Sequence, residues 1–221
     1  MRQITLAIFF VILAAVGYSQ PHTRLSFVVD PSANWMRTSN SSNVGNGKST
    51  LGYDFGLNAD YYFSGDERYA LATGLQITNI GGELDYRSTS GFKFSGVSMT
   101  GSPKIKYQLR YVEIPFSIKL RTDEFNRAYY WGLLGFSGMV NISAKGTSND
   151  GVMKKASIGD EVNLFNIAMN VGIGFDYDLG SSNAISAGLI FQNGLIDVTT
   201  DNAYSDKTII NSLKFKIGLI F

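Results

Sequence analysis

The sequence predicts an all-β protein, an eight-stranded antiparallel up-and-down transmembrane β-barrel with short periplasmic turns and longer extracellular loops. Three observations support this fold class. Apolar residues alternate with small or polar residues along most of the chain, and short and long connections between these segments also alternate. The composition combines a low charged fraction, 17%, with 24 glycines in 221 residues, a higher glycine content than the roughly 7% of an average protein.

The alternation has the period of a β-strand, because apolar residues recur at every second position and not with the helical spacing of 3.6. It is clearest from Phe165 to Tyr177, where the intervening residues are Asn, Ala, Gly and Asp. Eight segments show the pattern with differing regularity. In chain order, the predicted strands are 24–35, 51–63, 68–86, 109–121, 128–144, 164–178, 184–197 and 213–221.

The connections between these strands fall into two length classes that alternate along the chain. The short turns are 64–67, 123–127 and 180–183, and the long loops are 37–48, 87–103, 145–160 and 199–206. Short turns on one rim and long loops on the other are typical of bacterial outer-membrane barrels, with both termini on the short-turn side. The apolar residues Phe92, Phe94, Val97 and Met99 in the second long loop predict a hairpin that extends above the membrane.

The two faces of the strands are assigned by what the polar face contains. Gly, Ser, Asn and Ala dominate it, together with charges of both signs, whereas a soluble surface carries more charge and less glycine. We therefore expect the polar face to fill a narrow lumen and the apolar face to contact lipid. Because unpaired buried charges are costly, we expect a paired lumen charge network. Its predicted members are Asp54, Asp60, Glu113, Lys119, Arg121, Asp176, Asp178, Lys214 and Lys216.

Pro115 lies in the middle of the predicted strand 109–121, where its missing N–H removes a ladder hydrogen bond. The alternation on both sides of the proline still predicts a strand, with a local bulge or a missing ladder bond at this position and with Glu113 and Pro115 facing the lumen. Glu113 is expected to form an interior ion pair with Lys119, Arg121 or a lysine of the last strand.

Both ends of the chain carry sorting features. Arg2 and the apolar run Leu6–Val16 resemble a signal peptide, and that run is shorter than the ~20 residues of a membrane-spanning helix. We expect residues 1–19 to be cleaved, which leaves an outer-membrane barrel domain at 20–221. The alternating C-terminal residues form an expected signal for the barrel-assembly machinery. They are Phe215, Ile217, Leu219 and Phe221.

Aromatic residues gather beside the predicted short turns, as in the interfacial girdle of membrane proteins. The set comprises Tyr61, Tyr62, Phe63, Tyr69, Tyr129, Tyr130, Trp131 and Tyr177. In the third long loop, Lys154 and Lys155 form a basic pair that could meet anionic surface glycolipid, but two residues are too few to predict that contact.

The composition excludes several kinds of chemistry. The chain has no cysteine and a single histidine, His22, which the sequence places in a solvated N-terminal tail. We therefore expect no enzyme activity, no catalytic residues, no cofactor site and no metal site. A formal net charge of +1 gives no basic face for nucleic acid.

The segment Leu109–Lys119, with the sequence LRYVEIPFSIK, resembles the Y-x-E-I-P signature of the PorT-like outer-membrane β-barrel proteins of Bacteroidetes. Gly172–Phe175 and the C-terminal strand support the similarity. Leu25–Pro31 departs from it, because that family has a glycine-rich stretch there, and so does Ile190–Phe191, where an arginine-tyrosine pair is common. The resemblance implies an outer-membrane barrel and does not imply one function, since a role in type IX secretion belongs to few members.

From these features we expect a plugged barrel in the cell outer membrane that acts as a structural or interaction component of the envelope, in secretion or adhesion. The expected partners are outer-membrane lipid, the barrel-assembly machinery during insertion and another envelope or secretion protein, and no nucleic acid. Two alternatives stay open. One is a narrow transporter or lipid-handling barrel, and the other is a soluble periplasmic lipocalin-like binder with the faces inverted.

Overall fold

The computed structural model describes residues 22–39, 43–63, 67–87, 92–99, 101–180, 183–200 and 207–221. The predicted signal peptide, residues 1–19, lies outside the described residues. Within them, we find no helix with the length and apolar character needed to cross a membrane.

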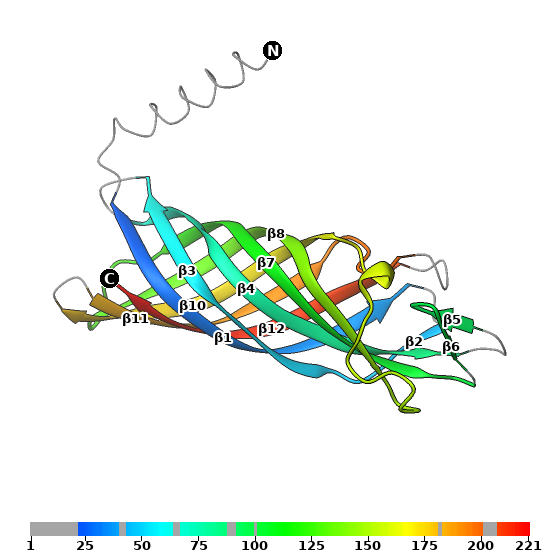
Figure 1. The fold of residues 1–221 in the computed structure, drawn as a ribbon. Helices are drawn as coiled ribbons and strands as arrows, with labels where there is room; N and C mark the ends of the chain where they lie inside the picture. The colour runs from blue at the N-terminus through cyan, green and yellow to red at the C-terminus, as the bar shows by residue number, and fades with distance from the viewer. Residues whose placement is uncertain are drawn as a thin grey trace, which may run out of the picture.

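Eight long strands of the described chain close into an antiparallel barrel (Figure 1). They are β1 (Thr23–Thr38), β3 (Thr50–Tyr62), β4 (Tyr69–Tyr86), β7 (Lys104–Arg121), β8 (Ala128–Ser148), β10 (Phe165–Gly180), β11 (Asn183–Gly194) and β12 (Thr208–Ile220). Each pairs with its neighbour in the chain, and β1 pairs with β12 to close the ring. The predicted fold class and the predicted up-and-down order are confirmed.

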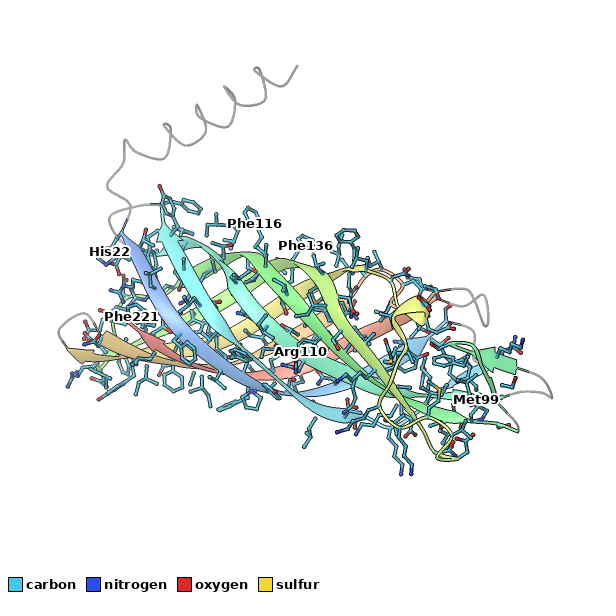
Figure 2. The ribbon with its side chains drawn as sticks, viewed as in Figure 1. His22, Met99, Arg110, Phe116, Phe136 and Phe221 are labelled. Carbon is cyan, nitrogen blue, oxygen red and sulfur yellow. The ribbon has the colours of Figure 1, made fainter. Side chains whose placement is uncertain are left out.

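Short elements within the long connections lie at one end of the barrel. They are β2 (Val44–Asn46), β5 (Phe92–Phe94), β6 (Val97–Met99), β9 (Ala156–Ser157) and the 3-10 helix η1 (Gly159–Glu161). β2 pairs with β4, β9 pairs with β8, and β5 and β6 form a hairpin. Figure 2 places Met99 at this end and both His22 and Phe221 at the opposite end, so the short turns and the two ends of the described chain share one rim.

The outer face of the barrel is apolar. Phe116 is 61% exposed, Phe136 is 53% exposed and Ile173 is 68% exposed, and the labelled phenylalanines point away from the barrel in Figure 2. A broad belt of exposed large apolar side chains suits contact with lipid and not with water. This orientation contradicts the lipocalin-like alternative, which needs the apolar face inside.

Several strands extend further toward the long loops than predicted, because the alternation changes phase. In β7 the apolar residues face outward from Val112 to Leu120 but inward from Ile105 to Tyr111. The predicted start of this strand at residue 109 is therefore wrong by five residues. A barrel that rises out of the bilayer into water needs a polar outer face and an apolar core, which explains the inversion.

The interior accordingly has two layers, and the prediction of a polar lumen throughout is wrong for the layer beside the long loops. A hydrophobic core fills this layer, with most of its members on inward positions of the strands. It includes Met36, Ile80, Leu84, Tyr86, Ile105, Tyr107, Leu109, Tyr111 and Met139, joined by Phe94 and Met99 of the hairpin. The layer beside the short turns contains the buried charges.

The β5–β6 hairpin, which the sequence predicts to extend above the membrane, packs into the hydrophobic core of the layer beside the long loops. The ring of Phe94 is 1% exposed. It lies edge-on to Tyr86 and Tyr107, with centroid distances of 5.7 and 6.1 Å. Burial of an aromatic side chain lowers the free energy of the fold relative to exposure of the ring to water. The hairpin therefore packs inward and covers this end of the barrel.

The predicted aromatic girdle is present in part. Phe63, Tyr69 and Tyr130 beside the short turns are more than half exposed on the outer face. Tyr62 and Trp131 are instead buried inside the barrel, because their strand positions have inward parity. The prediction that Tyr62 and Trp131 belong to the girdle is therefore wrong.

Candidate functional site: the interior charge network

The first cluster of the interior charges surrounds Lys214 of β12. Its Nζ lies 2.7 Å from Asp54 Oδ2 and 3.1 Å from Glu113 Oε2. Glu113 also accepts hydrogen bonds of 2.7 Å from Thr78 Oγ1 and from Gln192 Nε2. All of these side chains are buried. The cluster links β3, β4, β7, β11 and β12 across the lumen, and the partner of Glu113 is the lysine of the last strand.

The second cluster surrounds Lys119 of β7. Its Nζ lies 2.7 Å from Asp60 Oδ2 and 3.0 Å from Asp176 Oδ2. The indole ring of Trp131 lies beside it, with its centroid 5.5 Å from Lys119 Nζ and 5.7 Å from Lys216 Nζ. Lys216 is buried, no carboxylate of the described chain lies within 4 Å of its Nζ, and the Trp131 ring is a contact that stabilises its charge.

Two glycines make room for this indole inside the barrel. A Cβ atom at Gly174 would lie 2.3 Å from Trp131 Cζ2, and one at Gly188 would lie 2.6 Å from Trp131 Cη2. Real Cβ atoms do not approach other atoms so closely. At these two positions the excess of glycine therefore relieves crowding in a narrow lumen, as the composition predicts.

The third cluster lies at the short-turn rim around Glu67. Its Oε2 accepts from Arg121 Nη1 at 2.7 Å and from Arg24 Nη2 at 2.8 Å. The guanidinium of Arg121 also stacks on Tyr129, with its Cζ 3.6 Å from the ring centroid. His22, 62% exposed in its side chain, has Nε2 3.4 Å from Glu67 Oε1, so this histidine touches the rim as well as solvent.

Two acidic residues differ from the prediction. Asp178 has no ion pair within 4 Å in the described residues, and its Oδ1 accepts the Gly180 N–H at 2.6 Å. It therefore shapes the turn after β10 and does not belong to the lumen network, because its inward position lies at the very end of the strand. Asp30 of β1 is 2% exposed and accepts the Ile217 N–H at 3.3 Å. Sequence reasoning missed it, although it shares the inward parity of Arg24.

Pro115 lies where β4 and β7 separate. Ile114 and Pro115 have no partner in β4. The pairs on either side of this gap, Phe116 with Thr73 and Glu113 with Gln76, are in the same register. This gap matches the expected missing ladder bond, whereas the register shift of β7 lies at Arg110–Tyr111 and not at the proline.

The space left in the charged layer is small. A cavity of about 40 Å³ is lined by Asp30, Glu113, Pro115, Lys214 and Lys216 among others. A cavity of this size holds a few water molecules. A cavity of this size does not hold an organic solute.

The predicted C-terminal assembly residues all lie on the outer face of β12 or just after it. Phe215, Ile217, Leu219 and Phe221 are 45–54% exposed. Their placement toward lipid agrees with the alternation, and their role in assembly stays a prediction.

Comparison with known proteins gives one family and several barrels of low identity. The family model described as outer membrane protein beta-barrel domain matches residues 10–200. Neisserial surface protein A is 13% identical with a TM-score of 0.48, covering 89% of this chain and 97% of its own. Ail of Yersinia pestis, in complex with a heparin analogue, is 12% identical with a TM-score of 0.42, covering 90% and 99%.

OprG of Pseudomonas aeruginosa is 12% identical with a TM-score of 0.44, and the match covers 90% of this chain and 94% of OprG. Among proteins with curated descriptions, none matches the sequence significantly.

Proposed function

Because this chain belongs to the outer membrane protein beta-barrel domain family, an outer-membrane protein family, we propose that it is a closed barrel that serves the envelope as a structural or interaction component. The observation that carries the proposal is the double closure of the lumen. The ion pairs of Lys214 and Lys119 cross one layer, and the hydrophobic core with Phe94 fills the other. A narrow transporter needs a path, and the cavity of about 40 Å³ provides none.

Contacts with another envelope or secretion protein are then expected at the long-loop end, since function usually lies in loops on a rigid scaffold. Here β2 pairs with β4, β9 pairs with β8, and the Ile158 N–H just before η1 donates to the Ala144 carbonyl of β8, so the long loops are attached to the barrel wall. Such anchoring supports a defined contact surface and lowers the ordering cost of binding.

We also propose that the chain is not an enzyme. His22 lies at the short-turn rim, at the end of the barrel opposite the long loops. The buried carboxylates Asp54, Asp60 and Glu113 are engaged with lysines, so they are poorly placed for acid-base work on a substrate.

Within the family, we propose PorT-like membership and export by the signal at residues 1–19. The motif residues Tyr111, Glu113 and Pro115 support the first, because all three are inward positions of β7 and Glu113 holds Lys214. A structural role for the motif in barrel closure explains why it marks a family without marking one function.

In-cell photo-crosslinking tests the interaction role. A crosslinking residue replaces Val152, which is 56% exposed in the third long loop, and a control replaces Phe125, 66% exposed at the opposite rim. We expect one discrete envelope protein to be captured from position 152 and absent at position 125. A protein captured equally from both sites, or from neither, would contradict contact through the long loops.

A further inference from the structure

An open groove lies on the outer surface of β3, β4, β7 and β8, with a volume of about 330 Å³. Asn79 and Gly81 of β4 line it between the two neighbouring strands β3 and β7. Leu51 and Tyr53 of β3 border one side, and both are exposed, Leu51 by 91%. The basic and polar residues of β7 and β8 form the other side.

Four cations face this groove. They are Lys106, Arg110, Lys145 and Lys155. None has a carboxylate within 4 Å in the described residues, although Glu83 lies opposite Lys106 in the β4–β7 register. Lys104, two residues before Lys106 on the same face of β7, does have a carboxylate partner, because its Nζ lies 3.5 Å from Asp85 Oδ2. The groove is therefore a local excess of positive charge.

The guanidinium of Arg110 is held in place. Its Nε donates to Asn79 Oδ1 at 2.8 Å across the β4–β7 pair. This bond leaves the two Nη groups for an anion, and a guanidinium presents them in the geometry that matches a phosphate.

The groove lies at the height where the outer face changes from apolar to polar. The next outward residues of β7 below Arg110 are Val112, Ile114 and Phe116, which belong to the apolar face. Basic residues at this level meet the lipid head groups, and exposed Leu51 and Tyr53 adjoin them. Phosphate at the basic side and acyl chain along the apolar side match an anionic lipid.

We propose that this groove binds the phosphate group of an anionic outer-leaflet lipid, with Arg110 and Lys145 as the main phosphate ligands and Leu51 and Tyr53 against its acyl chain. Lys155, one of the two lysines of the third long loop whose role the sequence alone does not predict, also lines this groove. The proposal rests on family membership and on the outer surface, so it is independent of whether the lumen is closed.

The test is native mass spectrometry of the full folded chain in neutral detergent with diphosphoryl lipid A as the probe. The double variant Arg110→Gln/Lys145→Gln should bind about twenty-five-fold more weakly than wild type, since each basic residue near a lipid surface contributes roughly a factor of five. The matched control is Lys104→Gln, which removes a charge from the same face of β7 outside the groove and should bind as wild type.

Two further arms identify the ligand. Dephosphorylated lipid A should bind to the wild type and to the double variant with the same affinity. Excess inorganic phosphate should not displace the bound diphosphoryl lipid A from the wild type. Heat-dependent gel mobility verifies that every variant is folded. Equal binding by the double variant, equal binding of the dephosphorylated lipid, or displacement by phosphate alone would overturn the proposal, the last pointing to a free-phosphate site.

Discussion

Lys214 and Glu113 join the last strand to the fourth across the barrel, with the ammonium nitrogen 3.1 Å from Glu113 Oε2. The same ammonium contacts Asp54 at 2.7 Å, so one cation bridges two carboxylates from different strands. Burial of such a group is favourable only when its partners are all present.

Replacement of this cation should destabilise the fold. In Lys214→Met, Asp54 and Glu113 remain buried without their counter-charge, and loss of one side of a buried ion pair costs about 3–5 kcal/mol. Urea unfolding from lipid vesicles, followed by tryptophan fluorescence, measures the difference. The triple variant Asp54→Asn/Glu113→Gln/Lys214→Met removes the orphaned charges and should recover most of the loss. Wild-type stability of Lys214→Met would show that the cluster is not coupled as described.

The glycines under Trp131 give a second prediction. In Gly174→Ala the new methyl overlaps the indole and the Ala187 carbonyl oxygen, which lies 2.3 Å from the Cβ position. Overpacking of this kind costs about 1–3 kcal/mol, measured by the same unfolding transition. Gly138→Ala is the matched control, because a Cβ at Gly138 has nothing within 4 Å. Equal stability of the two variants would count against a crowded lumen.

The hairpin should detach when its aromatic anchor is removed. Truncation of a buried phenylalanine costs about 3–5 kcal/mol, so Phe94→Ala should free β5 and β6 from Tyr86 and Tyr107. Limited trypsin digestion detects this as faster cleavage after Lys93, while heat-dependent gel mobility still shows a folded barrel. The control is Val97→Ala, a less buried position of the same hairpin. Unchanged cleavage in Phe94→Ala would mean that the ring does not hold the hairpin.

A pH effect is expected in the third long loop. The Asp150 carboxylate accepts from Ser148 Oγ and, at 3.0 Å, from the Val152 N–H. These hydrogen bonds, that from Ser148 foremost, hold the pKa of Asp150 below its ordinary value. Because the folded pKa is lowered, the turn gains stability above the ordinary pKa and loses it as the pH falls through the lowered value.

NMR titration of the Asp150 carboxyl carbon measures this pKa directly. In Ser148→Ala the pKa should rise toward the ordinary value, since the largest stabilising contact of the charged form is gone. An identical titration midpoint in wild type and Ser148→Ala would refute the assignment.

Alternation along the chain was sufficient to predict eight strands and which side of each faces lipid, because a strand has only two faces. It also placed Asp54, Asp60, Glu113 and Lys119 inside. It could not show which carboxylate meets which lysine, since Lys214 and Glu113 lie 101 positions apart and their contact depends on the register around the whole barrel.

Other differences between prediction and structure arise because the prediction assumes that apolar residues face the same side along a whole strand. The inversion between Tyr111 and Val112 is visible in the sequence once the strand is allowed to leave the bilayer, and it would have extended β7 to Lys104. The inward turn of Phe94 is a tertiary effect, since its burial depends on Tyr86 and Tyr107 from two other strands.

The most direct test of the closed barrel is the conductance of the purified, refolded protein in planar lipid bilayers, with an open porin as the positive control in the same membranes. The structure predicts no steady conductance above that of the bare bilayer, because the ion pairs of Lys119 and Lys214 and the core around Phe94 fill the lumen in two layers. Steady single-channel openings of the folded wild-type protein would contradict it.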